Sequence, residues 1–167
     1  MTTLVLTVVG DDRAGLVAAV ANVVDAHGGN WENSQLAELS GAFAGIIEVS
    51  APAARIDALR AALAEIDGLL TAAVHATARD AETSRRFSFQ VLGNDHPGIV
   101  REVASTLTAH GLSVERMTTE MRDAAMAGGR LFEATIVAKV PASVDVDALK
   151  AELERLAAEI QVDVTLE

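Results

Sequence analysis

Short stretches in which apolar residues alternate with polar residues, or cluster as β-prone runs, predict a series of β-strands. The clearest alternation is FSFQVL at residues 87–92, and a second clear one ends the chain. Another strand is expected near His75, where an apolar run follows a helical pattern. Together with the strand near His75, the expected strands are residues 3–9, 30–38, 42–50, 87–92, 113–122, 130–140 and 160–167.

Apolar residues at intervals of three and four predict four amphipathic helices, each with one buried stripe. In two of them the pattern stops at a His-Gly pair, where glycine suits the left-handed end of a helix. The four stripes are Leu16, Val20, Val23 and Val24; Ile56, Leu59, Leu63 and Ile66; Ile99, Val103 and Leu107; and Val146, Leu149, Leu153 and Leu156.

An internal repeat divides the chain into two copies of one module. Residues 10–32 align without a gap on residues 93–115. The copies realign around Phe43 and Phe132, after a short insertion near residues 125–129 that we expect to lengthen a hairpin. The residues that recur unchanged are Gly10, Asp12, Gly15, Val17, Val20, Ala21, Ala26, His27, Gly28 and Glu32.

The order of elements is therefore β-α-β-β-α-β, twice, which predicts an α+β fold of two ferredoxin-like modules in tandem. Each module is expected to have a four-stranded antiparallel sheet with two helices on one face. The expected domains are residues 1–78 and 85–167, joined by a polar linker at residues 79–84. Since the other sheet face lacks a cover, we expect the modules to pair pseudo-symmetrically.

Composition and charge exclude several classes of function. The net charge of −11 opposes direct binding to nucleic acid, and the Arg85-Arg86 pair is interpreted as solvated charge beside the linker. The chain has no cysteine, so it has no disulfide, thiolate nucleophile or cysteine-ligated zinc. Its apolar runs are too short to cross a bilayer and its start lacks a secretory pattern, so we expect a cytoplasmic protein without a membrane partner.

The first strand-to-helix turn of each copy is the best candidate for chemistry. Its sequence is GDDRAGLV at residues 10–17 and GNDHPGIV at residues 93–100. The glycines let a ligand approach the backbone. Unpaired N–H groups at the helix start suit a carboxylate, and the adjacent Asp or Asn accepts hydrogen bonds from an ammonium group. The turn thus suits the two charged ends of a free amino acid.

A purely structural interpretation of the same turn stands beside the ligand-binding one. Asp12 and Asp95 are also suited to capping their helices, and Pro97 to the first helical turn. The helical period leaves open whether Asp95 or His96 is the cap. If Asp95 caps, Asn94 and Asp11 become the better ligand groups.

At this turn the sequence resembles the ACT domain, a ferredoxin-like module that senses amino acids and carries Asp, a short spacer and Gly before an apolar helix. Two tandem copies resemble the glycine cleavage system transcriptional repressor family. The resemblance implies that Asp12, Gly15 and Leu16, and likewise Asp95, Gly98 and Ile99, line small-molecule sites at module interfaces. Arg13 and Ala14 replace His96 and Pro97 of the second copy, so the two sites are expected to differ. The full candidate set is Asp11, Asp12, Arg13, Gly15, Leu16, Asn94, Asp95, His96, Gly98 and Ile99.

Other residues that suggest catalysis have simpler explanations. No Gly-x-Ser-x-Gly motif accompanies the Asp95-His96 pair, and no His-x-x-x-His spacing supports a metal site. We therefore expect no catalytic residue, metal or cofactor. Trp31 is predicted to pack at the contact between modules, and Met117 and Met121, on one side of their strand, to form core or an adaptable interface.

These observations predict a non-catalytic regulator that senses a small amino acid such as glycine. It is expected to form a homo-oligomer and to act on a protein partner, either a transcription regulator or an enzyme. The alternative is a detached regulatory subunit of an amino-acid or one-carbon enzyme. An enzyme acting alone is the third possibility, and the missing nucleophile and metal motifs oppose it.

Overall fold

The structure is a computed structural model that describes residues 1–76, 85–124, 128–160 and 162–166. The chain divides into two compact units, Met1–Asp80 and Ala81–Glu167. The expected linker at residues 79–84 lies outside the described residues, as do residues 125–127 of the expected hairpin insertion. At the base of that hairpin, the Ala124 N–H donates a hydrogen bond to the Gly129 carbonyl at 3.0 Å.

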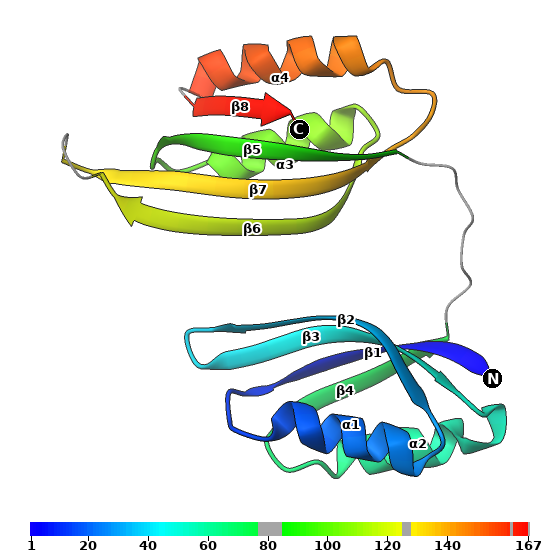
Figure 1. Ribbon diagram of the computed structural model, residues 1–167. Coiled ribbons are helices and arrows are strands. Elements are labelled where there is room, and N and C mark those ends of the chain that lie inside the picture. Colours follow the sequence, from blue (N-terminus) through cyan, green and yellow to red (C-terminus); the bar gives the residue numbers. More distant parts are fainter. Residues whose placement is uncertain (77–84, 125–127, 161, 167) are drawn as a thin grey trace. The chain divides into compact units, whose positions relative to one another are not determined.

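The first unit is an antiparallel four-stranded sheet with both helices on one face (Figure 1). Its strands are ordered β2-β3-β1-β4. The elements are β1 (Thr2–Asp11), α1 (Leu16–Ala26), β2 (Asn30–Leu39), β3 (Ala42–Ala51), the 3-10 turn η1 (Ala53–Arg55), α2 (Ile56–Ala64) and β4 (Leu69–Ala76).

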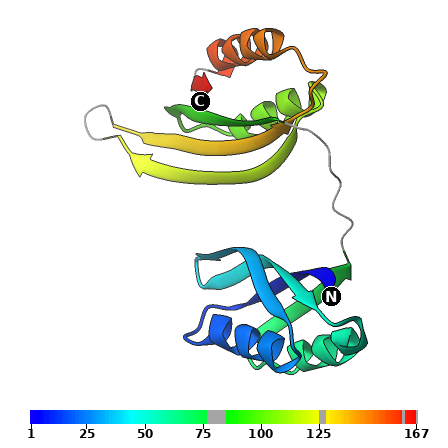
Figure 2. The ribbon, with the colours of Figure 1, turned by 45° about the vertical axis from the view of Figure 1, so that its right-hand side comes forward.

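The second unit repeats this arrangement, with strand order β6-β7-β5-β8. Figure 2 shows its two helices on the same face of its sheet. Its elements are β5 (Arg85–Asn94), α3 (Ile99–Ala109), β6 (Ser113–Asp123), β7 (Arg130–Val140), α4 (Val146–Ile160) and β8 (Val162–Leu166). The predicted α+β fold of two ferredoxin-like modules is therefore confirmed.

Each unit has its own core between the sheet and its two helices. In the first, Leu4, Leu6 and Val8 alternate inward along β1, and α1 buries its predicted stripe against them. In the second, Phe89 and Val91 do the same from β5 against α3 and α4. Burying one such side chain contributes about 1.5–3 kcal/mol, so the alternation itself selects which sheet face the helices cover.

Two predicted element boundaries were wrong. Ile66, assigned to a helical stripe, lies beyond the end of α2, although it is only 9% exposed. Ile160, assigned to the last strand, is the final residue of α4. In both cases apolar character continues past the end of the helix, so the hydrophobic pattern does not mark the residue at which the helix stops.

Three side chains singled out in the sequence lie as follows. Trp31 is half-buried and packs against the first unit's own core. Met117 and Met121 share one side of β6, as predicted, because they lie opposite Ile136 and Phe132. They are 43% and 38% exposed, so of the two predicted alternatives, core or adaptable interface, the core is excluded. The reason is that β6 is an edge strand, with a neighbouring strand on one side only.

Candidate functional site

The loop between β5 and α3 joins the end of a central strand to the start of a helix. Asp95 begins the loop and donates its backbone N–H to the Arg130 carbonyl at 2.8 Å. Gly98 ends the loop, with φ 100° and ψ −10°. That left-handed conformation is one that glycine adopts without strain. The first loop is held in the same way. The Asp12 N–H donates a hydrogen bond to the Gly41 carbonyl at 3.0 Å, and Gly15 ends the loop with φ 88°.

Neither of these two helices begins with a side-chain cap. The residues at the cap positions are Gly15 and Gly98, which have no side chain to donate or accept a hydrogen bond. The idea that Asp12, Asp95 or His96 caps its helix was therefore wrong, because each helix begins too late in the chain for these residues to reach the cap position. Among the described residues, neither the Asp12 nor the Asp95 carboxylate has a hydrogen-bond partner.

The absence of a side-chain cap leaves backbone donors exposed at the start of α3. The first intrahelical bond runs from the Glu102 N–H to the Gly98 carbonyl at 3.0 Å. The N–H groups of the preceding turn have no partner within the helix, as is general for helix starts. They carry the positive end of the helix dipole, which favours an anion.

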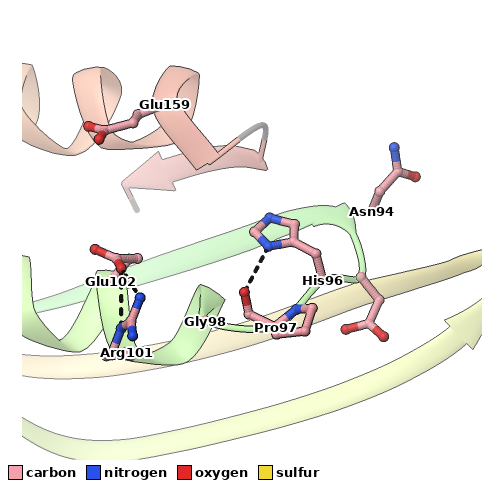
Figure 3. A pocket seen from close by; sticks show the side chains of 8 residues that line it. Asn94, His96, Pro97, Gly98, Arg101, Glu102 and Glu159 are labelled. Carbon is pink, nitrogen blue, oxygen red and sulfur yellow. Dashed lines mark hydrogen bonds and ion pairs between the residues drawn. The ribbon is translucent and has the colours of Figure 1, made fainter.

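An open pocket of about 540 Å³ lies at this helix start (Figure 3). Most of its lining comes from the loop and the first turn of α3, and one residue comes from α4. The lining residues are Asn94, Asp95, His96, Pro97, Gly98, Arg101, Glu102 and Glu159.

Charge is unevenly distributed in the pocket. Arg101 is paired with its neighbour Glu102, with Nη2 and Oε1 2.6 Å apart. The carboxylates of Asp95 and Glu159 also lie at the pocket, so carboxylates outnumber guanidinium groups. The His96 ring turns to the Pro97 carbonyl, with Nδ1 and the oxygen 3.2 Å apart (Figure 3). The pocket therefore combines helix-start amides, which attract an anion, with carboxylates that attract a cation.

The corresponding loop of the first unit is arranged differently. Arg13, at the position of His96, donates from Nη1 to the Asp67 carboxylate at 3.0 Å and from Nη2 to the Asp67 carbonyl. Its side chain lies over Gly68, where an added Cβ would be within 2.9 Å of the Arg13 Cζ. Arg13 therefore ties the first loop to the segment between α2 and β4.

The structure brings together four residues of the candidate set: Asn94, Asp95, His96 and Gly98. Leu16 and Ile99 are each 2% exposed and lie in the cores beneath their loops. Asp11, Asp12 and Gly15 are exposed on the first loop.

Four pocket residues, Pro97, Arg101, Glu102 and Glu159, were not in the candidate set. Arg101 and Glu102 could have been found from helical geometry, because they lie one turn after Gly98. Glu159 has no such signal, because only the packing of α4 brings it to the loop.

Two negative findings concern the part of the chain that the structure describes. No group of three or more His, Asp or Glu side chains there is placed to hold a metal ion. No helix there has both the length and the apolar character to span a membrane.

Comparison with known proteins identifies the fold. Residues 2–76 match the ACT domain family. The structure resembles an unknown protein from Galdieria sulphuraria at 29% identity, covering 99% of this chain and 97% of that chain with a TM-score of 0.86. It also resembles a protein provisionally assigned as a glycine cleavage system transcriptional repressor, at 19% identity over 99% of this chain and 96% of that chain, with a TM-score of 0.71. At that identity the likeness shows the fold alone. No curated protein sequence matches the chain.

Both units of this chain have the same strand order and helix placement. The first unit of the chain therefore matches the ACT domain family over residues 2–76, and the second unit repeats the same fold.

Proposed function

We propose that this chain is a non-enzymatic regulatory protein that binds a small free amino acid at the start of α3 and transmits its occupancy to a protein partner. The observation that carries the proposal is the open pocket at Gly98, where uncapped helix amides lie together with Asp95, whose carboxylate has no hydrogen-bond partner among the described residues. Its volume of about 540 Å³ is within the usual range of small-molecule pockets.

The carboxylate of the ligand binds the N–H groups of the first turn of α3. Gly98 presents no side chain at the approach to these donors, and no capping side chain of the described residues competes for them. The helix dipole adds attraction for an anion at this position.

The ammonium group of the ligand binds the acidic side of the pocket. Asp95 is the main candidate, because its carboxylate is exposed and has no hydrogen-bond partner among the described residues. Glu102 is already neutralised by Arg101, and Glu159 is paired with Arg155 at 3.1 Å. Glycine is the first ligand to test, since it has both charged ends and no side chain to place.

The two units contribute unequally to binding. The ion pair between Arg13 and Asp67 lies over the loop of the first unit, whereas the loop of the second unit lines an open pocket. We assign the principal site to the second unit for this reason.

The amino acid changes partner binding because it binds two conformational states of the chain with different affinities. The coupling free energy between two such sites is typically about 1–3 kcal/mol. The net charge of −11 favours a protein partner over nucleic acid.

Thermal unfolding against a panel of free amino acids tests the proposal. A ligand at about 100 times its Kd adds about 2.7 kcal/mol, a shift of several degrees in a domain of this size. Asp95→Asn is expected to abolish the shift. The matched variant Asp12→Asn, at the equivalent position of the first loop, is expected to retain it. A flat response to the whole panel, or equal loss in both variants, would contradict the proposed site.

A further inference from the structure

One face of the first unit's sheet carries none of that unit's helices. Both α1 and α2 lie on the other face (Figure 1). Strand alternation assigns Val9 of β1 and Ile46 of β3 to the uncovered face, since their neighbours Val8 and Ile47 are buried in the core beneath the helices. Val9 and Ile46 are 37% and 48% exposed.

These side chains belong to a continuous apolar patch on the uncovered face. The strand register places Ala44 between Val9 and Ala37, and Leu39 opposite Ala42. Leu39, the last residue of β2, is 78% exposed. Positions of this kind are usually polar in an antiparallel sheet, so an apolar set indicates a binding surface. The sheet-face patch consists of Val9, Ala37, Leu39, Ala42, Ala44 and Ile46, all of which are exposed.

The charges beside the sheet-face patch are acidic. Asp11 of β1 lies on the same face, opposite Ala42, and its carboxylate has no partner among the described residues. Glu48 follows Ile46 by two residues and lies on this face as well. The sequences of β1, β2, β3 and β4 contain no lysine or arginine. The complementary occupant therefore has apolar side chains flanked by cations.

The second unit has different side chains at the same positions. Arg122 of β6 stands where β2 has Leu39, and Glu133 of β7 stands where β3 has Ala44. Arg122 and Glu133 form an ion pair with each other. The repeated fold thus does not require apolar side chains on this face, and the sheet-face patch is a property of the first unit.

The dimensions of the sheet-face patch suit a single helix. It extends over β2, β3 and β1, a width of about 10 Å at the usual strand spacing, and from Ala42 to Ile46, a length of about 13 Å. A helix is about 10 Å wide, and about nine of its residues extend over 13 Å. A second copy of the chain is less suitable, because a stable interface takes about 20–30 residues from each side. Two copies of this face would also bring acidic residues together without a cation.

We propose that the sheet-face patch docks an amphipathic helix of a partner protein. The apolar stripe of the helix packs on Ala44 and Ile46, and its lysine or arginine side chains lie at the acidic edge beside Asp11. Binding through one apolar helix face is a common mode of peptide recognition. The inference extends the proposed function, which includes a protein partner, but docking here does not require an amino acid at the α3 loop.

A synthetic helix tests the docking. The probe is a peptide of about four turns with leucine on one face and lysine on the other, added to the full chain without any free amino acid. Nuclear magnetic resonance is expected to show chemical-shift changes concentrated at the amides of Val9, Ala44 and Ile46. Unchanged shifts at these amides, or equal changes in the sheet of the second unit, overturn the proposal. Shifts that change with protein concentration alone also overturn it, because a second copy would then occupy the patch.

Two matched substitutions separate the sheet-face patch from the net charge. Ile46→Lys places a cation within the patch and is expected to raise the Kd of the lysine peptide about tenfold. Thr135→Lys adds the same charge at the equivalent exposed position of the second unit and is expected to leave the Kd nearly unchanged. Circular dichroism checks that both variants are folded. Equal weakening by the two substitutions overturns the assignment of the binding surface.

A second peptide, with glutamine in place of lysine, tests the acidic edge. The wild-type chain is expected to prefer the lysine peptide, and Asp11→Asn is expected to reduce this preference. Asp25→Asn on α1 removes the same charge on the helix-covered side and is the matched control, expected to reduce the preference less. Equal reductions overturn the role of the acidic edge. Thermal shifts with free amino acids are measured separately, so a chain stabilised by glycine that does not bind the peptide contradicts this inference alone.

Discussion

Arg13 and Asp67 form an ion pair at 3.0 Å although they are 54 positions apart in the chain. The pair joins the loop before α1 to the segment before β4, and the guanidinium also bonds to the Asp67 carbonyl. In the second unit His96 stands at the position of Arg13 and turns to its own neighbour, Pro97. The exchange of arginine for histidine at this position therefore gives the two loops different contacts.

Replacing Arg13 with the residue of the second copy is expected to open the first loop. Under the proposed function, Arg13→His raises the number of amino acids bound per chain from one to two, as measured by isothermal titration calorimetry. The loss of stability is expected to be below about 1 kcal/mol, because exposed ion pairs contribute little. Asp67→Asn is the control, since it removes the charge of the ion pair while Arg13 and its bond to the backbone carbonyl at residue 67 remain. An unchanged stoichiometry in Arg13→His would show that the ion pair does not close the first site.

Gly98 is predicted to be sensitive to any substitution because of its backbone conformation. Its φ is 100°, and an added Cβ would meet the Arg101 Nη2 at 3.5 Å, an ordinary contact. The cost of Gly98→Ala is therefore conformational, about 1–2 kcal/mol, and is measured by chemical denaturation. Gly98→Asn is expected to cost less, because asparagine tolerates positive φ better. Equal costs for the two variants would argue against backbone strain as the cause.

The two cores are expected to respond separately to cavity-forming substitutions. Leu59 and Leu149 are both 0% exposed, and each core cluster contains residues of one unit only. Leu59→Ala and Leu149→Ala should each cost about 2–5 kcal/mol. Hydrogen exchange is expected to show lost protection in α2 for the first variant and in α4 for the second. Val17→Ala, at an exposed position of α1, is the control and should change stability by less than about 0.5 kcal/mol. Equal loss of protection in both units would show that the cores are coupled.

Glu115 is expected to make the second unit less stable in acid. The pKa of Glu115 lies below its usual value, chiefly because Arg86 donates hydrogen bonds to it at 2.7 and 3.3 Å, with Lys139 also nearby. A lowered pKa means that the unfolded chain binds this proton more readily, so the stabilisation is complete above about pH 4.3 and is lost as the pH falls through the folded-state pKa.

Glu115→Gln should flatten the acid limb of the stability curve, followed by denaturation at several pH values. Arg86→Gln should have a similar effect, and the double variant R86Q/E115Q should add little to either. Additive effects of the two single substitutions would show that the pair does not cause the pH dependence.

Most of the fold could be predicted from local patterns. The alternation FSFQVL at residues 87–92 and the stripe of Ile99, Val103 and Leu107 are found in β5 and α3. Such patterns are informative because burial of one face of a strand or helix repeats at the period of that element. The end of α4 was predicted less well, because an apolar residue such as Ile160 fits the end of a helix as well as the start of a strand.

Less of the candidate site could be predicted. The glycine-bearing loops were located from their sequence, because Gly98 precedes a clear helical stripe. The sequence alone could not show whether the aspartate carboxylates cap their helices or remain free, because this depends on the residue at which each helix begins. Arg101 and Glu102 follow from helix geometry, but Glu159 reaches the pocket only because α4 packs beside α3.

The sequence by itself determined that this protein consists of two copies of one βαββαβ module, each with its buried faces and its loop before a helix. Periodicity and repetition are local properties, so they can be observed along the chain. The tertiary structure alone decided that Arg13 meets Asp67, that Glu159 joins the second loop and that Val9 lies beside Ala44 on an uncovered sheet face. These relationships join residues that are far apart in the chain, and only the packing of strands and helices determines which of them come into contact.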